Sequence, residues 1–245
     1  MKVLATMLLT LGLCFGLNAA DGGTIKGSVK YEGEIPAPKI LPIPADKQGD
    51  CKCKEIDTEE LVVDKASKGI KWAIVRVIDA KPAGDVPTPA KVPQLDQKGC
   101  RFEPRVVIVP PGTDLEVLNP DGVAHNVRTT GLDLNNPGMN KMMAPSDPKM
   151  VIKGSKFLAE AEVVQFNCDI HPWMKSFVVV HDPRFAAITN ADGSYEIKNV
   201  PPGKYTLKVW QERCGEKPLS TEKPLVVEVK AGETVDAGVV NFTAK

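Results

Sequence analysis

The chain has 245 residues, with 31 basic and 31 acidic side chains and therefore no formal net charge at pH 7. This balance excludes a nucleic-acid-binding protein that relies on phosphate contacts, and it makes long-range electrostatic steering toward a partner weak unless the charges are segregated. Proline (21) and glycine (20) are frequent, and the short β-branched runs between them favour an all-β fold.

Residues 1–20 are typical of a secretory signal peptide. A basic start is followed by an apolar run over residues 3–17 and by small residues that end at Ala20. The run is too short for a membrane span, and Leu13 stands before Cys14 where a lipoprotein signal needs a small residue. The sequence therefore predicts cleavage near Ala20, a periplasmic or otherwise exported protein, and no transmembrane anchor.

Residues 21–90 contain the signals of an N-terminal β segment. Residues 23–31 alternate and predict a strand, residues 36–44 are rich in proline and extended, and residues 61–63 form a short strand. Residues 70–78 are apolar on nearly both sides, which predicts one long central strand. The stretch 81–93 carries four prolines and is interpreted as a surface linker.

The central segment, residues 91–182, has the clearest chemistry. Strands are predicted at 106–109, 115–118 and 163–167, with the turn at 119–122 leading to His125. Residues 128–149 have little periodicity and are interpreted as a polar loop. Clustered methionines in such a loop would form an adaptable contact surface or bind Cu(I) during loading rather than belong to the core: Met139, Met142, Met143 and the neighbouring Met150.

The strongest motif is the segment 168–174, which places three metal-binding side chains on a short loop between two predicted strands: Cys168, His171 and Met174. Together with the upstream His125, they offer two imidazoles, one thiolate and one weak thioether. This is the ligand set that holds a single copper ion for electron transfer, because soft sulfur favours Cu(I) and imidazole suits both oxidation states. The alternative is that Cys168 and Met174 are core residues and His171 a loop histidine; the combined spacing favours the metal site.

These residues carry a resemblance to the cupredoxins, the small blue-copper proteins. The loop is most similar to that of amicyanin, and the match extends over 95–180 through Phe102-Glu103-Pro104, Pro111-Gly112 and His125-Asn126-Val127. The resemblance implies a Greek-key β-sandwich. It also implies that His125, Cys168 and His171 are the strong ligands and Met174 the axial one, and that Asn126 ties the first ligand strand to the cysteine loop.

The C-terminal segment, residues 183–245, shows a different pattern. It predicts a hairpin over 188–197 with an Asp-Gly turn, then strands ending at Trp210, at 225–229 and at 239–242. It resembles the carboxypeptidase regulatory-like (transthyretin-like) β-sandwich, which implies a structural or interaction module. Since residues 23–31 and 70–78 supply the strands with which that family begins, we predict that the sandwich is split across 21–90 and 183–245, with the cupredoxin domain (91–182) inserted. The rival interpretation is that the N-terminal strands extend the sheet of the inserted domain.

Four cysteines outside the signal peptide remain beside Cys168: Cys51, Cys53, Cys100 and Cys214. In an oxidising compartment spare thiols pair, and a bridge between Cys51 and Cys53 would close a strained small ring. Both other connectivities join one member of this pair to Cys100 and its neighbour to Cys214. A site in which the thiolates of Cys51 and Cys53 bind a soft metal ion is the less favoured alternative, because no histidine lies nearby in the sequence.

We therefore predict an exported type-1 copper protein that transfers single electrons and is not an enzyme. A copper oxidase or nitrite reductase needs further histidine-rich copper centres, whereas this chain has three histidines in all. The alternatives are a periplasmic copper carrier or store that uses the methionines, and a purely structural β protein. The cupredoxin pattern implies that the ring edge of His171 lies at the surface, so that a redox protein, namely a dehydrogenase, cytochrome or oxidase, would dock near His171, Pro172 and Trp173.

Overall fold

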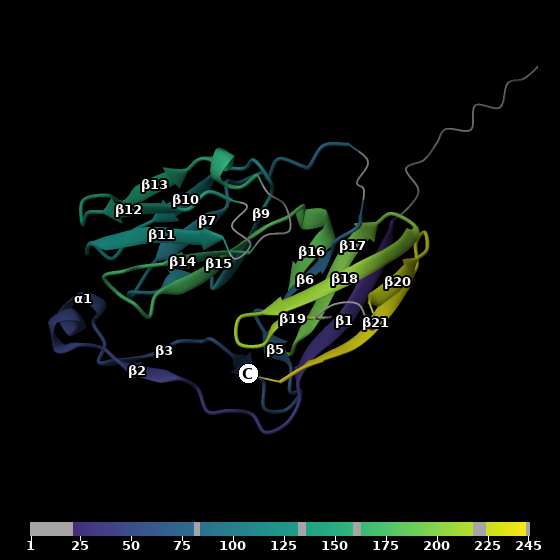
Figure 1. The fold of residues 1–245 in the computed structure, drawn as a ribbon, viewed down its shortest axis with the longest axis horizontal. Helices are drawn as coiled ribbons and strands as arrows, with labels where there is room; N and C mark the ends of the chain where they lie inside the picture. The colour runs from purple at the N-terminus through teal and green to yellow at the C-terminus, as the bar shows by residue number, and fades with distance from the viewer. Residues whose placement is uncertain (1–21, 81–83, 132–135, 159–162, 218–223, 244–245) are drawn as a thin grey trace, which may run out of the picture.

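The computed structural model describes residues 22–80, 84–131, 136–158, 163–217 and 224–243, and the regular elements of this part are strands apart from one short α-helix and three 3₁₀ turns (Figure 1). The predicted all-β class is therefore confirmed. The predicted signal peptide lies outside the described residues. Within the part of the chain that the structure covers, no helix has the length and apolar character needed to cross a membrane.

The first sandwich lies within residues 94–180 and contains two sheets whose facing side chains share one core. One sheet has the order β13 (Lys149–Ile152), β10 (Leu115–Leu118), β7 (Gln94–Gln97), β8 (Phe102–Glu103). The other has the order β12 (Met139–Met143), β11 (His125–Gly131), β14 (Val163–Asn167), β15 (Lys175–Val180), β9 (Val106–Val109). The strands predicted at 106–109, 115–118 and 163–167 are confirmed with the same bounds.

The second sandwich combines strands from both ends of the chain. Its smaller sheet has the order β17 (Ser194–Val200), β1 (Gly23–Tyr31), β21 (Thr234–Phe242). Its larger sheet has the order β16 (Ala186–Ile188), β6 (Ile74–Val77), β18 (Gly203–Gln211), β19 (Gly215–Lys217), and β20 (Leu225–Val229) also pairs with β18. The N-terminal β1 and β6 thus pair with C-terminal strands, as a split sandwich requires, while the domain boundaries themselves stay a prediction.

Two strand predictions are corrected. Residues 70–78 do not form one strand: β5 (Ile70–Lys71) pairs with β4 (Val62–Val63), and β6 begins only after Trp72, whose φ of 68° breaks the extended backbone. The segment 188–197 is not a paired hairpin, because β16 and β17 belong to different sheets. The Asp-Gly turn there carries the chain from one layer of the sandwich to the other.

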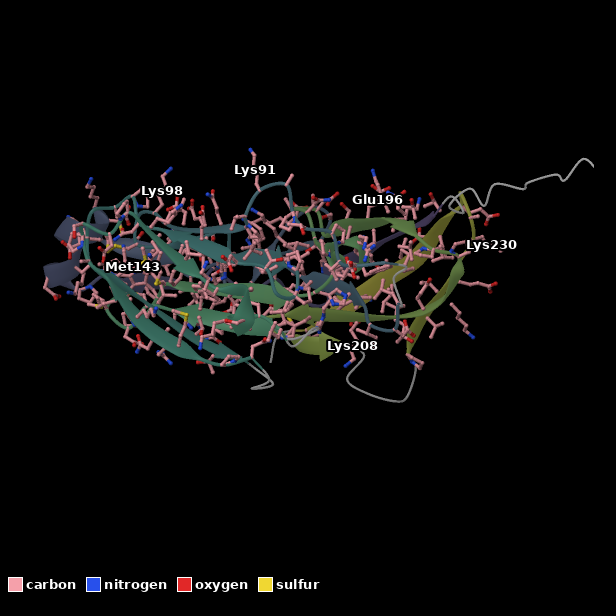
Figure 2. The ribbon with its side chains drawn as sticks, turned by 90° about the horizontal axis from the view of Figure 1, so that it is seen from above. Lys91, Lys98, Met143, Glu196, Lys208 and Lys230 are labelled. Carbon is pink, nitrogen blue, oxygen red and sulfur yellow. A yellow bond between two sulfur atoms is a disulfide. The ribbon has the colours of Figure 1, made fainter. Side chains whose placement is uncertain are left out.

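The two sandwiches pack against each other through β15 and β18. β15 is buried on both faces: Val178 and Val180 belong to the core of the first sandwich, whereas Phe177 and Val179 belong to a third cluster shared with Trp210. The rings of Phe177 and Trp210 lie 4.9 Å apart between centroids. Figure 2 shows the resulting elongated molecule, with Lys98 over the first sandwich and Lys230 near the opposite end.

An arm, defined as residues 40–57, leaves the second sandwich and reaches the far end of the first (Figure 1). It consists of β2 (Ile40–Pro42), the 3₁₀ helix η1 (Ala45–Lys47), α1 (Gln48–Cys51) and β3 (Glu55–Asp57). β2 and β3 pair only with each other among the described strands. Two further 3₁₀ turns, η2 (Gly154–Lys156) and η3 (Pro183–Phe185), occur in connections.

Candidate metal centre

The predicted ligand loop connects β14 to β15, which are neighbouring antiparallel strands. Its turn is closed by two backbone hydrogen bonds: Met174 N donates to the carbonyl of His171 (2.8 Å), and Cys168 N donates to the carbonyl of Met174 (3.4 Å). Because both flanking strands are fixed in the sheet, this short loop holds Cys168 and His171 on the same end of the sandwich.

His125 is the first residue of β11, directly after the predicted turn. Gly122 adopts a positive φ of 69° in that turn, and the Asn119 side chain donates to the carbonyl of Val123 at 2.9 Å. β11 pairs with β14 on the same sheet. His125 therefore lies at the same end of the sheet as the loop that contains Cys168.

The structure brings three of the four predicted ligands together. Nδ1 of His125 lies 3.1 Å from Nδ1 of His171, and Cys168 Sγ lies 3.7 Å from that same His171 nitrogen. Both imidazoles are fully buried and Cys168 is 1% exposed. Met174 is also 1% exposed and belongs to the same core cluster as Cys168.

The donor atoms fit a single metal ion. Metal–imidazole bonds in proteins are about 2.0 Å long, so two nitrogens that share one ion lie at most about 4 Å apart. The 3.1 Å separation of the two Nδ1 atoms meets this condition. With Cys168 Sγ, which lies 3.7 Å from His171 Nδ1, the cluster offers three donor atoms within 4.8 Å of one another.

Burial sets the protonation of these groups. It lowers the pKa of His171 to about 4, and the neighbouring His125 adds to this effect. Burial likewise lowers the pKa of His125, against the opposing charge of Asp121, and raises the pKa of the Cys168 thiol. In the metal-free protein at neutral pH the imidazoles are neutral and ready to coordinate, whereas the thiol proton must be displaced by the metal.

Asn126 performs the tying role that the resemblance implied. Its side-chain oxygen accepts a hydrogen bond from Asp169 N, and its Nδ2 donates to Asp169 Oδ2 (3.0 Å) and to Asn140 Oδ1 (2.8 Å). Its backbone N–H donates to Cys168 Sγ at 3.4 Å. Asn126 therefore fixes both the backbone of the cysteine loop and the sulfur itself.

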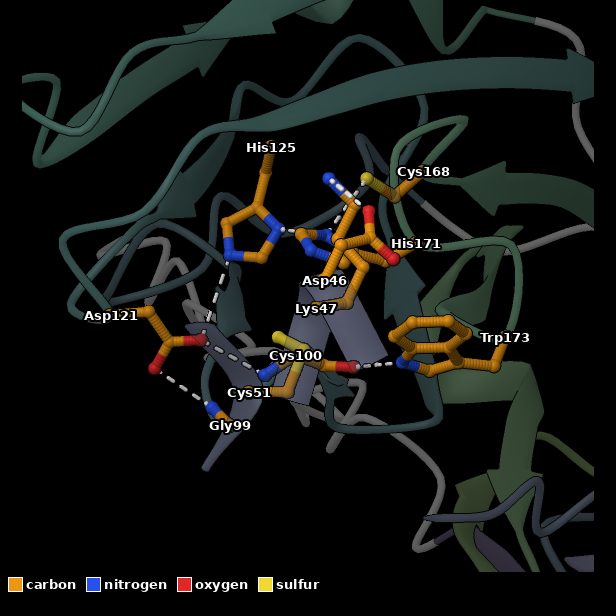
Figure 3. The surroundings of a disulfide bond; sticks show 10 residues. All are labelled: Asp46, Lys47, Cys51, Gly99, Cys100, Asp121, His125, Cys168, His171 and Trp173. Atoms are coloured by element: carbon orange, nitrogen blue, oxygen red, sulfur yellow. Dashed lines mark hydrogen bonds and ion pairs between the residues drawn. A yellow bond between two sulfur atoms is a disulfide. The ribbon is translucent and has the colours of Figure 1, made fainter. Parts of the chain in front are cut away.

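Asp121 is a site residue that sequence reasoning missed. Its carboxylate accepts hydrogen bonds from the backbone N–H groups of Gly99 (2.8 Å) and Cys100 (2.9 Å), and its Oδ2 lies 3.5 Å from His125 Nε2 (Figure 3). A carboxylate behind a ligand histidine fixes the ring orientation. Its position four residues before His125, in an Asp-Gly turn, was the available signal.

The expectation that the ring edge of His171 lies at the surface is wrong. The arm covers it: a ring nitrogen of His171 and the sulfurs of Cys51 and Cys100 all lie within 4.8 Å of one another, and Figure 3 shows Lys47 of the arm beside the ring. Pro172 is exposed. Trp173 is 9% exposed and its indole N–H donates to the carbonyl of Cys100 at 3.1 Å.

The cysteine predictions have a mixed outcome. Cys51 forms a disulfide with Cys100, which is a bridge of one of the two favoured connectivities. The predicted bridge between Cys53 and Cys214 is wrong, since neither cysteine is in a disulfide. The physical reason is that Cys53 packs against the core of the first sandwich, whereas Cys214 is buried in the core of the second.

The methionine prediction is corrected in part. Residues 128–149 contain β11 and β12 rather than a loop, and Met143 is a core residue, 1% exposed, whose sulfur accepts a hydrogen bond from Gln97. Met142, which alternates with it along the strand, is 64% exposed. Met139 and Met150 are partly buried against the same core.

A search of solved structures finds similarity between part of this chain and two kinds of cupredoxin. An amicyanin mutant in its Cu(I) form is 18% identical, with a TM-score of 0.32, over 44% of this chain and 98% of that one. A purple cupredoxin from Nitrosopumilus maritimus is 22% identical, with a TM-score of 0.28, over 36% of this chain and 98% of that one. No curated protein matches the sequence.

A family match falls partly on the second sandwich. Residues 164–237 match the family described as Polysaccharide lyase family 4, domain II. This is not the transthyretin-like family that the sequence suggested. The match includes β18 and β20 of the second sandwich, and it begins inside β14 of the first.

Proposed function

We propose that this protein is an exported type-1 copper protein that transfers single electrons between redox partners. The observation that carries the proposal is the buried cluster of Cys168, His125 and His171, with Met174 in the same core. One thiolate, two imidazoles and a thioether are the donor set of blue-copper electron-transfer sites. The proposed export depends on the signal peptide predicted over residues 1–20.

The residues around the cluster suit this chemistry. A copper ion bound there would supply a one-electron change between Cu(I) and Cu(II). The chain holds its own donors in place: the loop is closed by the Met174-to-His171 backbone bond, and Asn126 fixes the Cys168 sulfur. Donors that keep their positions in both oxidation states reduce the rearrangement that accompanies each electron transfer.

The docking surface is revised because the arm covers His171. The rings of His171 and Trp173 lie 5.4 Å apart between centroids, and the neighbouring Pro172 is exposed. We propose that the partner docks beside Pro172 and Trp173, over an indole in contact with the ligand ring. The zero net charge leaves apolar contact as the main docking term, in a small and short-lived complex.

We propose no enzymatic activity for this chain. The third histidine, His181, lies at the boundary of the two sandwiches, where its Nε2 is 3.2 Å from the carbonyl of Val77. It therefore cannot join the other two in a second copper centre of the kind that copper oxidases need. The second sandwich is proposed as a structural or interaction module.

A copper carrier or store is the second candidate. It is favoured by the complete burial of both histidines and by the 64% exposure of Met142, a soft ligand at the surface. An intense visible absorption band from the oxidised protein supports electron transfer, whereas tight binding restricted to Cu(I) supports the carrier.

The test is the visible spectrum and the metal content of the protein purified from its own compartment. We expect one copper ion per chain and an intense band from thiolate-to-copper charge transfer. Cys168→Ser should abolish the band, because a serine oxygen is hard and mostly protonated. Cys53→Ser is the matched control and should keep it. A band that survives in Cys168→Ser would overturn the proposed site.

A further inference from the structure

We propose that reduction of the Cys51–Cys100 disulfide creates a second soft metal site, in which both sulfurs and His171 bind one Cu(I) ion. The three residues come from the arm, from the loop between β7 and β8, and from the ligand loop. One donor atom from each lies within 4.8 Å of the other two. This site goes beyond the proposed function and rests on it only through the shared His171.

The disulfide between Cys51 and Cys100 lies in the protein interior beside a buried imidazole, as the donors of a metal site do, and not at the surface. Cys100 and His171 are fully buried and Cys51 is 5% exposed. The Nδ1 atom of His171 faces His125 and Cys168, and its Nε2 atom is buried without a hydrogen-bond partner in the described structure. A buried imidazole nitrogen without a hydrogen-bond partner is unusual, and on a ring beside two sulfurs it is available to bind a metal ion.

The redox step balances with a dithiol protein as the reductant. Two electrons and two protons pass from its thiols to the sulfurs of Cys51 and Cys100, and the reductant becomes a disulfide. Binding of Cu(I) then displaces the two thiol protons and forms two copper–sulfur bonds. No change in the oxidation state of copper is required.

The donor set selects Cu(I). Two thiolates are soft ligands, and monovalent copper accepts low coordination numbers, whereas a structural zinc site takes four ligands. The neighbours in the same core cluster are apolar, among them Ile43 and Trp173, and the carboxylate of Asp121 is engaged by the backbone N–H groups of Gly99 and Cys100. Since one imidazole serves both sites, we infer that an ion passes from the outer sulfurs to the inner cluster.

We expect the arm to separate from the first sandwich more readily when the disulfide is reduced. β2 and β3 pair only with each other among the described strands, and α1 has four residues. Besides the disulfide, the arm is held to the first sandwich by Ile43 and Ile56 in the core, by Leu41 and Cys53 packed against it, and by the hydrogen bond from Arg101 to the carbonyl of Asp57 (2.8 Å). The disulfide is the covalent part of that attachment, so its reduction would expose His171 to incoming metal.

The experiment measures Cu(I) affinity in the full-length Cys168→Ser variant, which lacks the inner thiolate. A coloured Cu(I) chelator competes for the ion before and after treatment with a phosphine reductant. We expect affinity to rise by about 100-fold on reduction, equivalent to about 2.8 kcal/mol. X-ray absorption should show two sulfur neighbours at the metal in the reduced protein.

Matched variants on the same background assign the site. Cys51→Ser with Cys100→Ser should lose the gain, and so should His171→Ala, which keeps the disulfide that holds the arm. Cys53→Ser should retain it. No rise in affinity on reduction, or an equal rise in the Cys51→Ser and Cys100→Ser variant, would overturn the proposal. The visible band of the unaltered protein tests the electron-transfer site separately, so the two failures are distinguishable.

Discussion

Asn126→Ala tests whether the ligand frame is built by the hydrogen bonds of one side chain. The asparagine is 4% exposed, and its amide connects β11 to the cysteine loop and to β12. The substitution removes the acceptor of Asp169 N and both donor contacts of Nδ2. In the variant the carboxylate of Asp169 keeps Arg128 as a partner at 2.7 Å. The backbone N–H of Asp169, by contrast, loses its acceptor.

The magnitude follows from these contacts. Asp169 is an exposed residue and the bond of its N–H to Asn126 is partly buried, so each of the three lost hydrogen bonds is assigned about 1 kcal/mol. Because the outer partners are exposed to solvent, we expect the free energy of unfolding of the metal-free protein to fall by about 2–4 kcal/mol. Loss of such outer-shell support typically weakens metal binding by about 10–100-fold, and we expect this for copper here.

Urea denaturation of the metal-free protein and chelator competition for the metal measure the two effects. Asn190→Ala is the matched control, since Asn190 is exposed and its side chain donates to the Ser194 hydroxyl at 3.1 Å, in the second sandwich. We expect that control to change stability by less than about 0.5 kcal/mol and to leave metal affinity unchanged. If Asn126→Ala behaves like the control in both assays, the hydrogen bonds of Asn126 do not hold the site.

The remaining predictions concern the axial ligand, the docking surface, the boundary of the sandwiches and pH. Met174→Leu should retain the blue band and raise the reduction potential by removing a weak axial donor; a lower potential in voltammetry would contradict this. Pro172→Ser should slow electron exchange with the partner without shifting the spectrum, and unchanged kinetics would place docking elsewhere. Glu212→Ala should lower the free energy of unfolding by about 3–5 kcal/mol, because it removes the carboxylate partner of the buried Arg105 guanidinium; a loss below about 1 kcal/mol in thermal denaturation would refute it. Since burial lowers the pKa of His171 to about 4 from 6.5, the unfolded chain binds this proton first, so metal-free stability should be complete above about pH 6.5 and fall toward pH 4. His171→Gln should show a flatter decline, and an identical decline would contradict the assignment.

Local patterns were enough to predict much of the first sandwich. The runs at 106–109, 115–118 and 163–167 are short, apolar and bounded by turn residues, so their strands could be placed without knowledge of their neighbours. Local pattern failed where a neighbour overrode it. Trp72 breaks an apolar run that otherwise predicts one strand, and Met143 is buried although its surroundings in the sequence are polar.

The donor types, and the loop that presents three of them, can be predicted from the sequence because the spacing of Cys168, His171 and Met174 is local. What covers these donors depends on the three-dimensional fold. The bond between Cys51 and Cys100 joins residues 49 positions apart, and it brings the arm against His171, more than a hundred residues further along the chain. No local pattern encodes such a contact, since it depends on the path of the arm between the two sandwiches. That path buries the imidazole that the ligand spacing alone would have placed at the surface.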